Sequence, residues 1–288
     1  MVKGAAEGAG LGNKFLANIR ETSAICHVLR VFTDSQVLRE GSVSPVEDLA
    51  IIRTELQLAD LVTLEKQTLP KTTKDRKVLE RWKMIQEFHQ MVAAGQQASE
   101  LLKQTHDPDL AQQVAKELCL LTAKPEIFVL NVDEAWVAQT DKLIAEFAPQ
   151  LGVVPHQVVV ISAQIESEIA TLTTQDQQLY LADLGLNQSG LERLAAVAYK
   201  TLKLQSFLTA GQLEVRAWTI AQGTKAPQAA AVIHTDFEKN FIKAKIANYA
   251  DFVACQGWAG VREAGKQRLE GKDYAMQEGD VVEFMRKT

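Results

Sequence analysis

Two short apolar runs constrain the fold most, because each is typical of a buried strand and one helix-length segment separates them. The runs are EIFVLNV at 126–132 and QVVVISA at 157–163, both rich in β-branched residues. A strand, a helix around 135–148 and a second strand predict a parallel βαβ unit. The run AICHVLRVF at 24–32 predicts a further buried strand of the same sheet.

Helical periodicity interrupts this pattern over 44–123. Ser44-Pro45 is a typical helix start, and two long and two shorter amphipathic segments follow it with only short breaks. This block predicts an antiparallel helical hairpin inserted between two strands of the sheet. An amphipathic helix at 188–203 precedes the C-terminal segment. There VRAWTI, FIKAKI and VVEFM alternate with short helical pieces, which predicts a small α+β domain from about residue 204.

Composition narrows the function classes. The formal net charge is −5, which argues against a generally basic nucleic-acid-binding surface but allows a local basic patch. Cys26, Cys119 and Cys255 lie far apart and form no Cys-x-x-Cys, so neither a disulfide framework nor a zinc site is expected. No signal peptide and no apolar run of about eighteen residues is present. We therefore expect a cytoplasmic protein with no membrane partner.

The glycine-rich stretch KGAAEGAGLGNKF at 3–15 invites comparison with a phosphate-binding loop. Such a loop needs a strand before it and Gly-Lys-Ser/Thr at the start of the next helix. Neither condition holds, because Lys14 follows Asn13 and Phe15 stands in place of the hydroxyl. The chain contains no Gly-Lys-Ser/Thr anywhere. The local interpretation is a glycine-rich loop before a helix.

A candidate base-binding site follows the two predicted strands. Asn-Val-Asp-Glu at 131–134 ends the first strand and Ser162-Ala163 ends the second, at the edge where open α/β sheets place ligands. GTPases carry Asn-Lys-x-Asp and Ser-Ala-Lys at these two positions. Glu134 replaces the aspartate that fits guanine, whereas adenine offers an amino donor. The substitution therefore favours adenine.

Longer stretches carry a resemblance to a known family. They are GAGLGNKFLANIRETSAICHVLRVF, RTELQLADL, the Asn-Val-Asp-Glu strand end, EVRAWTIAQGTKAPQAAAVIHTDFEKNFIKAKI and LEGKDYAMQEGDVVEF. Together they closely resemble the YchF / Obg-like ATPase family over essentially the whole chain. The resemblance implies a translation-factor-class P-loop NTPase that prefers ATP to GTP, uses Mg²⁺ and associates with the ribosome.

The resemblance also implies a domain organisation. Residues 1–43 and 124–203 would form part of an NTPase domain of the G type, with a doubly wound sheet that is incomplete here. Residues 44–123 would form a helical coiled-coil insertion, and residues 204–288 a TGS domain of ubiquitin-like β-grasp shape.

The beginning of the chain carries a further expectation. In the family, a loop like that at 3–15 follows switch II, so the P-loop, switch I and the magnesium ligands are expected in a segment before Met1. Relatives often carry a histidine where this chain has Ser-Gln-Val-Leu at 35–38. Phosphoryl transfer depends on positioning and charge stabilisation by those missing groups. Hydrolysis by this polypeptide alone is therefore not expected, and no catalytic residue is assigned.

The resemblance assigns roles to the strand-end residues. The adenine would be held by Asn131, Val132, Glu134, Ser162 and Ala163. Asn131 would fix the loop, and the backbones of Val132 and Ala163 would face the base.

Two basic stretches are candidates for contact with ribosomal RNA phosphates. The denser one lies at the turn of the helical hairpin and includes Lys71, Lys74, Arg76 and Lys77, and the second places Lys243 and Lys245 on one face of a C-terminal strand. Solvated charged faces are the alternative interpretation for both. Two functions therefore remain open: an ATP-binding, ribosome-associated NTPase, and a ribosome- or RNA-binding module without nucleotide turnover.

Overall fold

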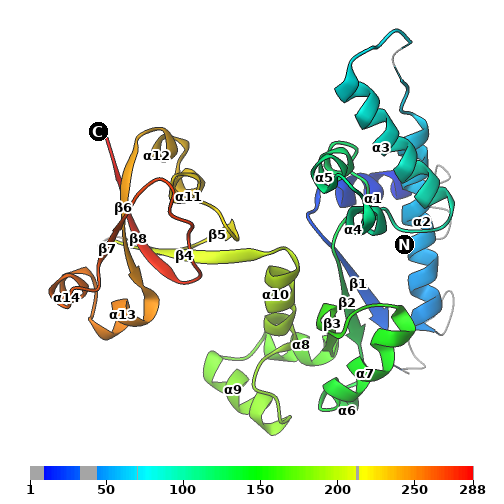
Figure 1. The fold of residues 1–288 in the computed structure, drawn as a ribbon. Helices are drawn as coiled ribbons and strands as arrows, with labels where there is room; N and C mark the ends of the chain where they lie inside the picture. Colours follow the sequence, from blue (N-terminus) through cyan, green and yellow to red (C-terminus); the bar gives the residue numbers. More distant parts are fainter. Residues whose placement is uncertain (1–9, 33–43, 70, 212–213, 288) are drawn as a thin grey trace. The chain divides into compact units, whose positions relative to one another are not determined.

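The computed structural model describes residues 10–32, 44–69, 71–211 and 214–287. They form two compact units, divided in the chain between Ala198 and Tyr199 (Figure 1). No helix within the described ranges is both long and apolar enough to cross a lipid bilayer. The glycine-rich stretch as far as residue 9 and the Ser-Gln-Val-Leu segment at 35–38 lie outside the described residues.

A three-stranded parallel sheet lies at the centre of the first unit. Strands β1 (Ile25–Arg30), β2 (Glu126–Asn131) and β3 (Val158–Ile161) are arranged in the order β1-β2-β3. All pairs are parallel, and the register places Asn131 beside Ile161. The predicted parallel sheet is confirmed, since a helical crossover returns the chain to the end of the sheet where the previous strand began.

Five helices follow the second and third strands. They are α6 (Glu134–Val137), α7 (Thr140–Leu151), α8 (Ala163–Ile169), α9 (Thr174–Asp183) and α10 (Gly190–Thr201). A 3₁₀ turn at Pro155–Gln157 leads into β3.

The pattern predicts one helix around 135–148, whereas the structure has α6 and α7. The Thr140 hydroxyl donates a hydrogen bond of 2.8 Å to the Val137 carbonyl, and Gln139 leaves helical geometry with ψ 29°. This local hydrogen bond ends the first helix, because it satisfies a carbonyl that the next turn would otherwise use.

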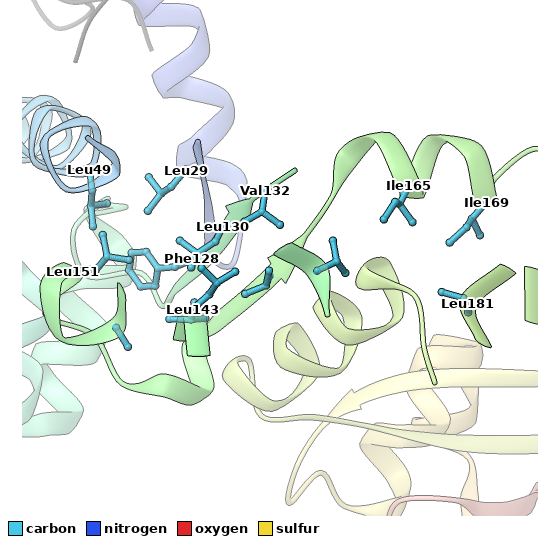
Figure 2. Packing of buried hydrophobic residues seen from close by; sticks show 14 residues of the cluster. Leu29, Leu49, Phe128, Leu130, Val132, Leu143, Leu151, Ile165, Ile169 and Leu181 are labelled. Atoms are coloured by element: carbon cyan, nitrogen blue, oxygen red, sulfur yellow. The ribbon is translucent and has the colours of Figure 1, made fainter. Parts of the chain in front are cut away.

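The main core combines side chains from one face of the sheet with side chains of α2, α7, α8 and α9 (Figure 2). Its labelled members are Leu29, Leu49, Phe128, Leu130, Val132, Leu143, Leu151, Ile165, Ile169 and Leu181. Helix α10 covers the other face, where Leu194 and Val197 pack on side chains of β2 and β3.

Strand β1 is buried on one face only, so the prediction of a fully buried strand is wrong on the other face. His27 and Leu29 are buried, but Cys26, Val28 and Arg30 are exposed. Val28 retains 62% exposure. The cluster under α10 draws its buried sheet residues from β2 and β3 alone, so the outer face of β1 has no share in it.

A block of helices occupies the segment between β1 and β2, as predicted. It comprises α2 (Pro45–Glu65), α3 (Arg76–Ala93), α4 (Ala98–Gln104) and α5 (Pro108–Glu117), and α1 (Gly10–Glu21) precedes β1. The two long helices form the predicted hairpin, and the two short ones complete its core. That core consists of Leu64, Met84, Ile85, Phe88, Val92, Ala98, Leu101, Ala111, Val114, Ala115 and Leu120. In Figure 1, α4 and α5 lie beyond the end of the sheet at which β2 begins.

A buried carboxylate joins the hairpin to the segment that enters β2. Asp60 of α2 is 0% exposed. One carboxylate oxygen accepts from the Leu121 backbone N–H at 2.7 Å, and the other accepts from the Thr122 N–H at 2.8 Å and hydroxyl at 2.7 Å. Burial raises the pKa of Asp60, and these hydrogen bonds act in the opposite direction. A polar group buried so deeply requires these partners.

A second polar cluster lies where β2 begins. Glu126 accepts from His27 Nε2 at 2.9 Å and from the Arg53 guanidinium at 2.9 Å, while the His27 ring stacks on Phe128 with centroids 5.2 Å apart. Burial alone would raise the pKa of Glu126, but the hydrogen bonds from His27 and Arg53 and the Arg53 charge outweigh it and lower the pKa to about 2. His27 is thus a structural residue in this packing.

Acidification is expected to destabilise the first unit through Glu126. The folded pKa of about 2 lies below the usual 4.5, so the stabilisation is present above the usual value and is lost as the pH falls through the folded value. The loss between pH ~5 and ~2.5 is about 2 to 3 kcal/mol. Urea unfolding at pH ~5 and at pH ~2.5 measures this loss of unfolding free energy. In Glu126→Gln the unfolding free energy should differ less between the two pH values. An equal pH dependence in both proteins would contradict this expectation.

The second unit is a five-stranded mixed sheet. Strands β4 (Leu204–Ala210), β5 (Val215–Ala221), β6 (Phe241–Asn248), β7 (Arg268–Glu270) and β8 (Asp280–Arg286) take the order β5-β4-β8-β6-β7. β4 and β8 are parallel and the other neighbours antiparallel. The predicted α+β character of this segment is confirmed.

Four short helices accompany this sheet. They are α11 (Ala226–Ile233), α12 (Thr235–Lys239), α13 (Tyr249–Ala254) and α14 (Trp258–Glu263). The core between the sheet and α11 contains Phe207, Ile220, Ala226, Ala229, Ala230, Phe241, Ala244, Ile246, Met276 and Val282.

Candidate base-binding edge

The carboxyl ends of β2 and β3 lie side by side, because the two strands are parallel and Asn131 pairs with Ile161. The backbone continues this pairing beyond the strands, where the Val132 N–H donates to the Ile161 carbonyl at 2.9 Å. The loops that carry the predicted base-binding residues therefore leave the sheet at one edge, where ligands of open α/β sheets bind.

The Asn131 side chain connects these two loops. Its Oδ1 accepts a hydrogen bond from the Ala163 backbone N–H at 3.0 Å. Ala163 is exposed, whereas Ser162 before it and Val132 beside it are each 3% exposed. The edge thus combines two buried residues, Val132 and Ser162, with the exposed Ala163, whose backbone N–H is held by Asn131.

Glu134 lies three residues after Asn131, where the chain that leaves β2 enters α6. It is the first residue of α6 and is exposed. Nearby, the Tyr180 hydroxyl donates to Glu168 at 2.6 Å. This hydrogen bond, with smaller contributions from burial and from the charges of Glu168 and Glu134, raises the pKa of Tyr180 to about 12. The same hydrogen bond lowers the pKa of Glu168.

An exposed aromatic ring lies on the same short helix. Trp136 of α6 is 42% exposed, and the Lys142 ammonium lies 5.8 Å from its ring centroid.

The charge of the base-binding edge is a separate feature. Glu134 and Glu168 place two carboxylates near it. Acidic groups repel phosphates and accept from amino groups, so the edge suits the base of a nucleotide rather than its phosphate chain.

The five residues predicted to bind the base lie at the ends of β2 and β3 or in the segments that directly follow these strands. Val132 and Ser162 are buried, Ala163 and Glu134 are exposed, and the Asn131 side chain accepts from the Ala163 N–H. Within the described ranges no group of three or more His, Cys, Asp or Glu is arranged to hold a metal ion. The described residues therefore supply no magnesium site of that kind.

The predicted basic stretch lies at the turn of the helical hairpin. Lys71 and Lys74 precede α3, and Arg76 and Lys77 open it. Arg76 pairs with Glu80 at 2.7 Å, and this hydrogen bond raises the pKa of Arg76. The three lysines are exposed, and none has an acidic partner within 4.0 Å among the residues described. They remain available to an anionic partner.

The second predicted pair lies on β6. Lys243 and Lys245 share one face of the strand, opposite Met285 and Glu283 of β8. Lys245 donates to Glu283 at 2.9 Å and is only partly exposed. Glu283 on the adjacent strand therefore neutralises the charge of Lys245. The β6 pair is thus a weaker phosphate-binding surface than the hairpin turn.

The sequence analysis did not single out two residues, Glu166 and Arg193, that connect α10 to α8 and to β3 beside the base-binding edge. Glu166 of α8 accepts from the Gly190 N–H at 2.6 Å, and Arg193 of α10 donates to the Val160 carbonyl at 2.9 Å. The sequence did contain a signal for Arg193. It lies next to Leu194 and four residues before Val197, on the face of α10 that packs on the sheet, where a charged residue is unusual.

Comparisons with known proteins agree with this architecture. A family model named YchF-GTPase_C, described as "Protein of unknown function (DUF933)", matches residues 204–287. The chain is 42% identical to "Ribosome-binding ATPase YchF" of Bacillus subtilis, covering 99% of this chain and 78% of the relative. It is 44% identical to the protein of the same name from Pasteurella multocida, with the same coverage.

A solved structure matches the whole chain. The chain resembles "Structure of the Schizosaccharomyces pombe YchF GTPase" with a TM-score of 0.81 and 32% identity, covering 99% of this chain and 78% of that one. The names of these relatives differ in the nucleotide, ATP in the bacterial proteins and GTP in the yeast protein. Base selection is therefore the property to examine at the edge.

Proposed function

Because the chain belongs to the YchF / Obg-like ATPase family, we propose that it binds ATP in preference to GTP at the base-binding edge and associates with the ribosome. The hydrogen bond between Asn131 Oδ1 and the Ala163 N–H carries the nucleotide part of the proposal. It holds the exposed backbone of one loop against the other, as a site for a flat base requires.

The preference for adenine rests on Glu134. An ionised carboxylate accepts hydrogen bonds and cannot donate them. The adenine amino group is a donor, whereas guanine carries an oxygen acceptor at the equivalent ring position. Guanine also carries donors at N1 and at its 2-amino group, from which the shorter aspartate of GTPases accepts. The longer Glu134 would not reproduce that fit, and its carboxylate would accept from the adenine amino group. Val132 and Ala163 would face the base through their backbones, and Ser162 would support the loop from its buried position.

Nucleotide binding is tested by equilibrium titration of a fluorescent ATP analogue with magnesium. We expect saturable binding that Glu134→Ala weakens by about tenfold and that GTP displaces poorly, since one charged hydrogen bond is lost. Glu146→Ala is the matched control, because Glu146 is an exposed acid in the middle of α7. Equal displacement by ATP and GTP would refute the adenine assignment.

The phosphate and magnesium contacts of ATP need other groups. The sequence contains no Gly-Lys-Ser/Thr, and the described residues hold no metal cluster of three or more acids, histidines or cysteines. Magnesium would neutralise the phosphates of bound ATP. No catalytic residue of this chain is proposed.

A second function, a ribosome- or RNA-binding module without nucleotide turnover, is favoured by the lysines of the hairpin turn, which have no acidic partner within 4.0 Å among the described residues. In either function the lysines would contact RNA phosphates. We also propose the finer domain division, with 44–123 as a helical insertion into an NTPase domain built from 1–43 and 124–203, and 204–288 as a TGS domain.

The ribosome contact is tested by co-sedimentation at several salt concentrations. Combined Lys71→Glu, Lys74→Glu and Lys77→Glu substitution is expected to weaken binding by about tenfold or more and to reduce the salt dependence by about three charges. Lys243→Glu tests whether the alternative basic surface on β6 contributes to binding. Lys103→Glu is the control for charge reversal on the helical block, because Lys103 already pairs with Glu100. Unchanged sedimentation of the triple variant would remove the hairpin turn from the proposal.

A further inference from the structure

The first turn of α10 is hydrogen-bonded to three elements that flank the base-binding edge, namely β3, the start of α7 and α8. Arg193 donates to the Val160 carbonyl at 2.9 Å, two residues before Ser162. The other terminal nitrogen donates to the Thr140 hydroxyl at 3.3 Å, where α7 begins after α6. One guanidinium therefore links the end of β3 to the helix pair that follows β2.

A carboxylate completes this support. Glu166, in the first turn of α8, accepts from the Gly190 N–H at 2.6 Å and the Leu191 N–H at 3.3 Å. The helix that begins at Ala163 is thus joined to the start of α10 by an anion placed on two free backbone donors.

Gly190 allows this close approach. A Cβ added there would lie 2.8 Å from Glu166 Oε1 and 2.9 Å from Ile161 Cγ1. Both atoms belong to the strand and helix that flank the Ser162-Ala163 loop. A larger residue would push α10 away from that loop, since Cβ contacts below about 3 Å are not tolerated.

Anchoring of α10 does not require these polar groups. Leu194 and Val197 already pack on Ile127, Val129, Val159 and Ile161. Arg193 is half-buried, and its Nε is buried without a hydrogen-bond partner in the described structure. Burying a guanidinium in this way costs free energy that an apolar side chain would avoid. The arrangement is explained better by placement of the loops than by stability.

We propose that Arg193 and Glu166 are positioning residues for the nucleotide base: together they hold the Ser162-Ala163 loop at the spacing from Asn131 and Glu134 that selects adenine over guanine. This inference rests on the proposed function. Neither side chain touches the base. Each acts through an element that carries the Ser162-Ala163 loop, Arg193 through β3 and Glu166 through α8, so the effect of removing them falls on base selection as well as on affinity.

The test compares the full chain with Arg193→Met, Arg193→Lys and Glu166→Gln. Affinities for ATP and GTP come from titration with fluorescent analogues, and protection of the Ala163 amide comes from hydrogen exchange. Glu126→Gln is the control, because it removes a buried charge at the opposite end of β2. Urea unfolding of every variant shows whether the losses of stability are comparable.

We expect Arg193→Met to weaken ATP binding by about tenfold and to bring the ATP-to-GTP preference towards one. Arg193→Lys should give an intermediate result, because lysine can reach one of the two acceptors. The control should lose stability while its affinities stay within about twofold of the parent. An Arg193→Met protein that keeps its preference and its Ala163 protection would overturn the proposal.

Hydrogen exchange separates this inference from the function it rests on. If the parent protein binds no nucleotide but Arg193→Met loses Ala163 protection, Arg193 still places the Ser162-Ala163 loop, while the proposed nucleotide function fails and the role in base selection fails with it. If the parent binds ATP and Arg193→Met changes only the unfolding free energy, the nucleotide function stands and the positioning role fails.

Discussion

Replacement of Asp60 by alanine is expected to lower the free energy of unfolding by about 4 kcal/mol. The substitution removes both carboxylate oxygens that accept from the Leu121 and Thr122 backbone and from the Thr122 hydroxyl. Three donors would then be buried without partners, and each costs about 1 to 3 kcal/mol. Urea denaturation followed by circular dichroism measures the loss.

Two further variants test whether the loss comes from the hydrogen bonds of Asp60. Asp60→Asn keeps the shape and one acceptor, so we expect it to recover part of the loss. Glu65→Ala changes an exposed acid of the same helix, 4.0 Å from His89, and should cost less than about 1 kcal/mol. A similar loss for Asp60→Ala and Glu65→Ala would show that the buried carboxylate does not join α2 to the segment entering β2.

Asn131→Ala is expected to weaken binding of the ATP analogue by about 30-fold. The substitution removes the acceptor of the Ala163 N–H, so the loop that presents its backbone to the base is no longer held. It also removes an amide next to the proposed adenine site. Titration measures the affinity, and hydrogen exchange at Ala163 measures the release of the loop.

Asn131→Asp is the matched variant for this prediction. It keeps an oxygen in the position of Oδ1, so protection of the Ala163 amide should persist. Loss of binding in the alanine variant alone would assign the effect to the loop contact, and loss in both would assign it to the amide group or the added charge. Unchanged binding in Asn131→Ala, with weaker binding in Glu134→Ala, would contradict the role of the loop contact.

Local pattern was sufficient for several elements. The β-branched runs at 126–132 and 157–163 predicted β2 and β3, since strands buried on both faces have few other compositions. Ser44-Pro45 predicted the start of α2. The connectivity of these strands predicted that the Asn131 and Ser162-Ala163 loops leave the sheet at one edge, because parallel strands joined by helices bring their carboxyl ends together.

Other elements could not be predicted in this way. β4 is LQSFLTA, in which no Val or Ile occurs, so its short alternation carries too weak a signal to predict a strand. β7 has three residues, too few for a periodic signal. The burial of β1 on one face depends on where α10 packs, which its own sequence does not report.

The residue types and spacing of this chain therefore determined its parallel βαβ unit, its helical insertion and the residues at the strand ends, since each follows from local periodicity and chain connectivity. Only the tertiary structure decided which polar side chains became partners. Asn131 and Ala163 are 32 residues apart, Asp60 and Leu121 are 61 apart, and Arg193 and Val160 are 33 apart. Distances along the chain of this size carry no periodic signal, and the packing that closes them is cooperative.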